Sequence, residues 1–304
     1  MALNYRDIVH PEDEKALRQL QNTPGVKLIA EKLVTGDERF TRSLYMADSV
    51  KLGPNQLPKI YNLLPPIAEK LGIEVPELYI KQTSELNAMT LGDKHPLIVI
   101  YSGLVSALTR EELTAVLAHE CGHILCHHCL YTTVLNLLKK LSEIGSNYVG
   151  IPFSSQILGA ALYASYYWSR RAEYSADRAA LVYTEDLDLT KTALIRLAAG
   201  PLEVSKDINL DSFAVQTQMQ DNQVSGSGIW EKIKYMLTVG LYDHPLMTTR
   251  LAELNDWGKS AQYRMVLDGM KNKSIVSSGE KCPGCGMEIE DAWKFCKHCG
   301  YQLK

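Results

Sequence analysis

The spacing of apolar and polar residues over the first hundred positions predicts helices followed by a small sheet. Residues 10–75 have the pattern of polar-flanked helices, one running from Asp13 to Leu20 and another from Leu57 to Leu71 with an interruption at Pro65-Pro66. Three short β-rich segments follow, separated by turn-like polar, Pro or Gly residues. They are Glu77–Lys81, Asn87–Leu91 and Leu97–Tyr101. We expect them to form a small sheet just before the next helix.

That next helix has a clear start signal. Thr109 and Glu112 form a capping-box pair, in which each side chain satisfies a backbone N–H at the beginning of the helix. Leu108 and Leu113 have the spacing of a hydrophobic staple across the same turn. We therefore expect a rigid, well-capped helix that begins near Arg110.

The rest of the chain alternates between helical and polar stretches. A second long helix is predicted from about Ser154 to Tyr183. Asp211–Gly228 is rich in Gln, Ser, Gly and Asp and has the composition of a loop, and helices resume at Ile229–Leu237 and after Thr248. We expect four parts: an N-terminal helical extension (1–50), a main domain (51–270), a polar linker (271–281) and a small C-terminal module (282–304).

Composition and charge exclude some partners. With 304 residues, 46% hydrophobic and 22% charged, the chain is typical of globular proteins. Its formal charge of −3 gives no reason to expect nucleic acid as a partner. The N-terminal residues lack the apolar segment of a secretory signal, so we expect a cytoplasmic location. In that reducing compartment, closely spaced cysteines bind metal more often than they form disulfides.

One uncharged stretch is a candidate membrane segment. Ile144–Ser169 is long enough to cross a bilayer, but Gly and Pro residues interrupt it and it contains seven Ser, Asn and Gln residues. We expect a buried or surface-associated helix here, and peripheral contact with a membrane or a protein partner stays open.

The chemistry centres on His119-Glu120-Cys121-Gly122-His123. Two histidines four residues apart on a helix are offset by about 40° around its axis, so both imidazoles face one ion. Glu173, fifty residues after His123, supplies a carboxylate as the third ligand and leaves the fourth position of a zinc ion open. Zinc lowers the pKa of a bound water to about 7, and Glu120 is placed to move its proton. Asp177 has the spacing to accept the far N–H of a zinc-bound imidazole.

These residues fit two other patterns less well. An HExxH pattern also occurs by chance on helices, where a buried histidine is a satisfied core residue, but the helix cap, Gly122 and the second motif favour the metal site. A metzincin pattern would need Gly at position 126 and His at position 129, and the chain has Cys126 and Cys129 there.

The run Cys126-His127-His128-Cys129 is not interpreted as a second metal site. On a helix, consecutive residues point about 100° apart, so four of them cannot converge on one ion. We expect Cys121, Cys126 and Cys129 to be small buried hydrophobic residues. No role is assigned to His128.

Five segments in this order resemble the HtpX-like gluzincin zinc metallopeptidases over roughly residues 50–265. They are Leu86–Gly92, Tyr101–Leu104, Glu112–Glu120, Ser169–Asp177 and Asp243–Arg250. The chain lacks convincing transmembrane helices and is therefore similar to the soluble branch of that family.

The resemblance implies a role for each motif residue. His119, His123 and Glu173 would hold the catalytic zinc, Glu120 would be the general base, and Asp177 would orient a ligand histidine. His244 would donate to the oxyanion of the tetrahedral intermediate, and Arg250 would brace this region by an ion pair. Asn87, Ala88 and Met89 would form the edge strand on which an extended peptide docks.

The C-terminal cysteines predict a second, structural zinc ion. Cys282, Cys285, Cys296 and Cys299 form two CxxC pairs separated by ten residues, and four thiolates complete a tetrahedral shell. The metal should supply most of the stability of so small a zinc ribbon. Its charged residues cancel, which argues against nucleic-acid binding. Recruitment of a partner by the ribbon is a hypothesis.

Together these observations predict an α+β, mostly helical fold: a gluzincin-type domain with a small β-sheet, followed by a four-cysteine zinc ribbon. The predicted function is a zinc metalloendopeptidase acting on polypeptides, with one catalytic and one structural zinc ion. The alternative is a latent or inactive scaffold that keeps its metals and uses the ribbon for partner binding, with Asp211–Gly228 occluding the cleft.

Overall fold

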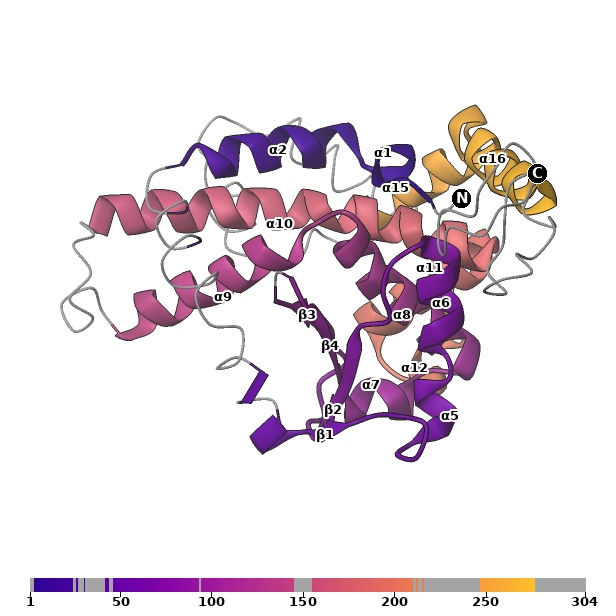
Figure 1. Cartoon of the computed structure of the whole chain (residues 1–304), viewed down its shortest axis with the longest axis horizontal. Coiled ribbons are helices and arrows are strands. Elements are labelled where there is room, and N and C mark those ends of the chain that lie inside the picture. Colours follow the sequence, from indigo (N-terminus) through magenta and orange to yellow (C-terminus); the bar gives the residue numbers. More distant parts are fainter. Residues whose placement is uncertain are drawn as a thin grey trace, which may run out of the picture.

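The computed structural model shows a mostly helical chain with one small sheet, which confirms the expected α+β class (Figure 1). It describes residues 3–23, 26, 30, 42–43, 46–92, 94–144, 155–209, 212, 215 and 247–276. The helices are α1 (Tyr5–Ile8), α2 (Pro11–Gln21), α5 (Pro58–Tyr61), α6 (Leu64–Leu71), α7 (Ser102–Ala107), α8 (Arg110–Leu125), α9 (Cys129–Ile144), α10 (Ser155–Thr184), α11 (Leu187–Ala199), α12 (Leu202–Ser205), α15 (Met247–Lys259) and α16 (Ala261–Val276). The strands are β1 (Val50–Lys51), β2 (Glu77–Lys81), β3 (Ala88–Leu91) and β4 (Leu97–Tyr101).

The four strands form one mixed sheet in the order β1-β2-β4-β3. β2 and β4 run parallel, whereas β1 and β3 pair antiparallel with their neighbours. The three predicted strands are confirmed, and the two-residue β1 is too short for a sequence pattern to reveal. Within the described part of the chain, β3 is an edge strand.

Helix α8 begins as predicted. The Thr109 hydroxyl accepts a hydrogen bond from the Glu112 N–H at 3.2 Å, and the Glu112 carboxylate accepts one from the Thr109 N–H at 2.9 Å. This capping box fixes the first turn of the helix that carries His119 and His123.

A glycine brings α8 and α10 into close contact. A Cβ atom at Gly122 would lie 2.6 Å from the Ala179 Cβ and 2.9 Å from the Ala176 Cα, both on α10. No side chain fits into so short a space. The two helices therefore approach each other closely within the motif itself.

Helix α2 belongs to a second hydrophobic core. Ala16 and Leu20 of α2 pack with Val134 and Leu138 of α9 and with Trp168 of α10. Figure 1 shows α2 lying beside part of the longer helix α10. Helix α2, a described part of the predicted extension, is thus packed against the helix that carries Glu173.

The structure corrects the interpretation of Cys126-His127-His128-Cys129 as continuous helix. Helix α8 ends at Leu125, and His127 takes the left-handed conformation with φ 60°. The His127 N–H bonds to the Ile124 carbonyl and the His128 N–H to the His123 carbonyl, which is the pattern of a Schellman cap. Because glycine usually occupies the left-handed position, a histidine there gave no sign of the turn.

A second correction concerns the prolines. Pro65 and Pro66 do not interrupt a helix but lie in the first turn of α6, where a proline has no helical N–H bond to lose. The break falls earlier, between α5 and α6. The second long helix is confirmed as α10, and α15 confirms the helix expected after Thr248.

One segment predicted as a linker overlaps a helix, and other predicted segments lie outside the described residues. Helix α16 continues to Val276, so it covers the start of the predicted linker, in which residues 271–276 contain neither Gly nor Pro. The segments predicted as a loop and a helix, Asp211–Gly228 and Ile229–Leu237, lie outside the continuously described ranges. In the described parts of the chain, none of the helices combines the length and apolar character needed to cross a bilayer.

A buried ion pair fixes the start of α8 to α11, and its removal should destabilise the fold. Arg196 Nε lies 2.9 Å from Glu112 Oε1, with side chains 6% and 4% exposed. We expect Arg196→Met to lower the free energy of unfolding by about 3–5 kcal/mol, because it leaves a buried carboxylate unpaired.

Urea denaturation at fixed zinc concentration measures this effect. The matched change Lys191→Met breaks a pair with Asp188, whose side chain is 82% exposed, and should cost less than about 1 kcal/mol. Equal losses in the two variants would contradict the assignment.

Candidate metal centre

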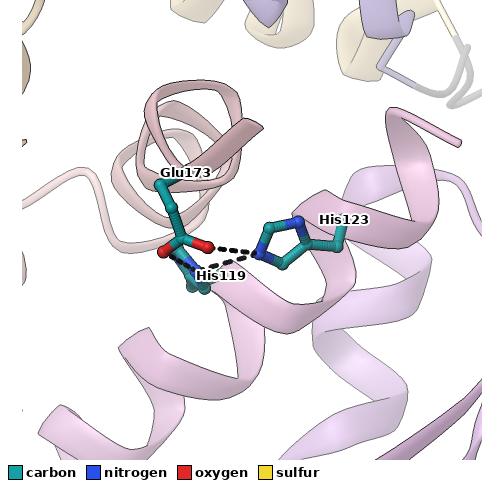
Figure 2. Close-up of side chains that lie close together, drawn as sticks. All are labelled: His119, His123 and Glu173. Atoms are coloured by element: carbon teal, nitrogen blue, oxygen red, sulfur yellow. Dashed lines mark hydrogen bonds and ion pairs between the residues drawn. The ribbon is translucent and has the colours of Figure 1, made fainter. Parts of the chain in front are cut away.

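Two helices bring three candidate ligands together. His119 and His123 lie one turn apart on α8 and Glu173 lies on α10, and their ligand atoms all lie within 4.8 Å of one another (Figure 2). Glu173 Oε2 is 3.4 Å from His119 Nε2, and Glu173 Oε1 is 3.5 Å from His123 Nε2. The two Nε2 atoms are 3.2 Å apart.

These separations fit a zinc ion. A tetrahedral ion with bonds of about 2.0–2.1 Å to nitrogen and oxygen keeps its ligand atoms about 3.3 Å from one another. The two imidazole nitrogens are 3.2 Å apart, and each has a different oxygen of the Glu173 carboxylate at 3.4 or 3.5 Å. Two imidazole nitrogens and one carboxylate oxygen are also the donor set of catalytic zinc sites, in which the fourth position is open.

Asp177 and Arg250 form hydrogen bonds and ion pairs with the ligand residues. Asp177 Oδ1 lies 2.9 Å from His119 Nδ1. Arg250 of α15 donates to both Asp177 oxygens, at 2.6 and 2.9 Å, and lies 2.9 Å from Glu173 Oε2. Burial raises the pKa of Asp177, but the Arg250 guanidinium outweighs it and holds that pKa below its usual range. The ionised Asp177 accepts the Nδ1–H of His119, so His119 Nε2 is left as the metal-binding nitrogen.

The electrostatics of the cluster favour a cation. With neutral histidines, three carboxylates (Glu120, Glu173, Asp177) and Arg250 leave a formal charge of −2. Burial lowers the pKa of His119, but its hydrogen bonds to Asp177 and Glu173 outweigh this and raise the pKa to about 10. Burial lowers the pKa of His123. The carboxylates thus attract one positive charge to His119, and a divalent ion would compete with that proton.

Glu120 is held by a residue of the sheet. Its side chain faces β3, where the Thr90 hydroxyl donates to Glu120 Oε2 at 2.6 Å. Glu120 and Thr90 are 6% and 3% exposed. The edge strand therefore fixes the orientation of the carboxylate that lies next to the first histidine.

The cluster opens into a cleft of about 500 Å³. Strand β3 and the segment before it line one side, and α11 contributes apolar side chains on another. The lining residues include Asn87, Ala88, Met89, Thr90, Val116, Ala193, Leu194 and Leu197, together with His119, Glu120, His123, Glu173 and Arg250.

The structure brings most of the predicted site residues together. The three ligands, Glu120, Asp177, Arg250 and the Asn87-Ala88-Met89 segment all line or support this cleft. His244 and the four cysteines of the predicted ribbon lie outside the described residues. Cys121, Cys126 and Cys129 are buried, as expected.

The sequence pattern did not predict a role for three polar residues near the site: Thr90, His128 and Asp13. Thr90 contacts Glu120, and His128 links His123 to Asp13 by hydrogen bonds of 3.0 and 2.9 Å. Thr90 directly follows the predicted peptide-binding segment, so its place on that strand could have indicated a position near the site. No spacing in the sequence connects residue 13 with residue 128.

Removing the Thr90 hydroxyl should slow catalysis without loss of metal. We expect Thr90→Val to lower kcat about tenfold, because the change keeps the shape of the side chain but releases the Glu120 carboxylate from its hydrogen bond. Zinc content should stay unchanged, as Thr90 contacts none of the ligand atoms. The control is Thr114→Val on α8, whose hydroxyl donates to the Arg110 carbonyl of its own helix. A wild-type kcat for Thr90→Val would show that this bond has no part in the reaction.

Comparison with known proteins agrees with the expected metallopeptidase family and zinc ribbon. The model of peptidase family M48 matches residues 54–258, and a zinc-ribbon domain matches residues 281–303. The plastoglobule-localized metallopeptidase 48 of Arabidopsis thaliana is 34% identical over 278 residues, which cover 90% of this chain and 78% of that protein. Protease HtpX of Shewanella denitrificans is 27% identical over 218 residues, covering 62% of this chain and 70% of that protein.

Among solved structures, the crystal structure of S. mikatae Ste24p aligns with 79% of this chain and 62% of that chain, at 16% identity and a TM-score of 0.38. That likeness is too weak to bear on the fold. The family match spans more than half of the chain, and the geometry of His119, His123 and Glu173 is that of a zinc site. The chain therefore belongs to peptidase family M48 and is a zinc metallopeptidase.

Proposed function

We propose that the protein is an endopeptidase in which His119, His123 and Glu173 hold the catalytic zinc and Glu120 is the general base. The observation that supports this most strongly is the convergence of three ligand atoms within 4.8 Å in a cleft that also contains Glu120. A zinc ion bound there would polarise the scissile carbonyl and acidify a water molecule.

Glu120 carries out the proton transfer in this proposal. Its carboxylate takes a proton from the attacking water and delivers it to the leaving nitrogen. Because Thr90 donates to Oε2, we assign the transfer to Oε1. Asp177 and Arg250 keep His119 and Glu173 in place during the reaction, through the contacts of 2.6–2.9 Å that join them.

The substrate is an extended stretch of polypeptide. β3 is an edge strand beside Glu120, and a peptide that adds to such an edge gains backbone hydrogen bonds independent of its sequence. Asn87, Ala88 and Met89 are the residues we assign to this docking. Ala193, Leu194 and Leu197 of α11 line the same cleft, and they favour an apolar substrate side chain next to the scissile bond.

Several finer assignments are part of the proposal. The match to a zinc-ribbon domain supports a structural zinc on Cys282, Cys285, Cys296 and Cys299. His244 is assigned to the oxyanion, and the domain limits at 51–270 and 282–304 are kept. A cytoplasmic location and membrane contact through residues 144–169 stay predictions, and the Arabidopsis relative is named for plastoglobules of the chloroplast.

A map of new protein termini tests the activity. Cells or extracts containing the wild-type chain are compared with those containing the Glu120→Gln chain, and we expect internal cleavage sites that appear only with the wild type. Identical maps would contradict proteolysis through Glu120. Removal of terminal residues alone would contradict endopeptidase activity.

A further inference from the structure

A hydrogen-bonded line of buried polar side chains (His123, His128 and Asp13) leads from the metal cluster to helix α2. His123 Nδ1 lies 3.0 Å from His128 Nδ1, and His128 Nε2 lies 2.9 Å from Asp13 Oδ2. His128 is 0% exposed and Asp13 is 1% exposed. The line joins α8, the turn after it and α2.

Asp13 is fixed by two further donors. The Ser175 hydroxyl donates to Oδ2 at 2.5 Å, and the Trp168 indole N–H donates to Oδ1 at 3.2 Å. Burial raises the pKa of Asp13, but its contacts with His128 and Ser175 outweigh this and lower the pKa. The carboxylate of Asp13 therefore accepts hydrogen bonds from three side chains and donates none.

With a neutral His128, the line has one consistent set of hydrogen positions. Because Asp13 only accepts, His128 carries its hydrogen on Nε2, and Nδ1 of a neutral imidazole is then an acceptor. His123 donates to that acceptor from Nδ1. Its Nε2 is left with a lone pair that faces His119 and Glu173, as a metal ligand requires.

The backbone supports the same arrangement. The Schellman cap at the end of α8 bonds the His128 N–H to the His123 carbonyl at 2.9 Å. His123 and His128 are thus joined through their main chains and through their rings. A continuous helix would have carried His128 away from His123, since residues five apart do not face each other.

We propose that Asp13 and His128 are positioning residues that hold His123 in the tautomer and orientation that zinc binding requires. The N-terminal helix α2 then completes the metal site, although Asp13 lies outside residues 54–258, which match the family. Asp177 gives His119 the equivalent support from α10. The inference rests on the proposed function, because it needs zinc at His119, His123 and Glu173.

The change Asp13→Asn should reverse the direction of the hydrogen bonds along the line, with little change in side-chain volume. The Trp168 N–H keeps the amide oxygen on its own side, so the amide NH2 group points to His128 and Ser175, which can both accept. His128 then donates to His123, and the hydrogen of His123 moves to Nε2, where it opposes metal binding. We expect zinc affinity at this site to fall about 10–100-fold.

The measurement uses the full chain. Competition with a chelator gives the zinc affinity, and cobalt substitution assigns it, because nitrogen- and oxygen-ligated cobalt absorbs differently from thiolate-ligated cobalt. Circular dichroism and the melting temperature of the chelator-treated chain should match the wild type. Glu77→Gln is the control, since it makes the same carboxylate-to-amide change at a partly buried residue of β2 that does not line the cleft.

Two changes at His128 keep the test decisive should Asp13→Asn fail to fold. His128→Leu removes the acceptor and should lower zinc affinity about 10–100-fold, whereas His128→Asn offers an amide oxygen near the place of Nδ1 and should restore most of it. A merely structural role would not distinguish these two variants by zinc affinity.

The opposite results would overturn the inference. These are a folded Asp13→Asn chain with wild-type zinc affinity, equal affinities for His128→Leu and His128→Asn, or an equal loss in Glu77→Gln. Failure of the proposed function has a different signature, because the wild-type chain would then give the same terminus map as Glu120→Gln or would bind no zinc that depends on Glu173.

Discussion

Replacing Glu120 with Gln is expected to lower kcat for peptide hydrolysis by about 10²–10⁴-fold while the chain keeps its zinc. The amide has nearly the shape of the carboxylate, and its oxygen can still accept from the Thr90 hydroxyl, now 2.6 Å from Oε2. It cannot take the proton of the attacking water, and that step is the role we propose for Glu120. Steady-state kinetics on an unstructured polypeptide and elemental analysis of bound zinc measure the two quantities.

The matched control for this prediction is Glu111→Gln. Glu111 precedes His119 by two helical turns and is exposed in the first turn of α8, so its change should alter kcat less than about twofold. A wild-type kcat for Glu120→Gln would remove Glu120 from the reaction. Loss of zinc from Glu120→Gln would show that the residue acts on the metal and not on the proton.

The ligand set was predictable because it is written in short spacings. His119 and His123 share one helix face, and Glu173 lies four residues before Asp177 on a second helix. What the spacing leaves open is whether the two helices meet. Gly122 supplies that contact, since any side chain there would collide with Ala176 and Ala179. The motif therefore includes both the ligands and the residue that lets the carboxylate reach them.

The supporting residues were less predictable for a physical reason. Asp13 and His128 are 115 positions apart, and their contact depends on how α2 packs along α10. His128 also depends on a left-handed residue at His127, which is a non-glycine exception to the usual helix ending. Local periodicity carries neither kind of information. Asp13 and His128, which support the site through these tertiary contacts, are thus found only in the folded chain.

Replacing Glu173 with Ala should remove the catalytic zinc and with it nearly all activity. The change leaves two imidazoles to hold the ion and raises the formal charge of the cluster from −2 to −1, so both coordination and electrostatic attraction weaken. We expect zinc affinity at this site to fall by more than about 100-fold, which exceeds the effect typical of outer hydrogen-bond partners. The value of kcat/KM should fall about 10³-fold or more.

Zinc stoichiometry separates this effect from unfolding. Arg250 keeps both hydrogen bonds to Asp177 in the variant, so α15 should stay docked on α10. Because the four cysteines are proposed to hold a second ion, bound zinc should fall from about two to about one per chain at limiting free zinc. Glu185→Ala is the control, as it removes a partly exposed carboxylate paired with Lys70, just after the end of α10. Two ions retained by Glu173→Ala would show that the pair of histidines binds zinc without the second helix, and the two-helix site would be wrong.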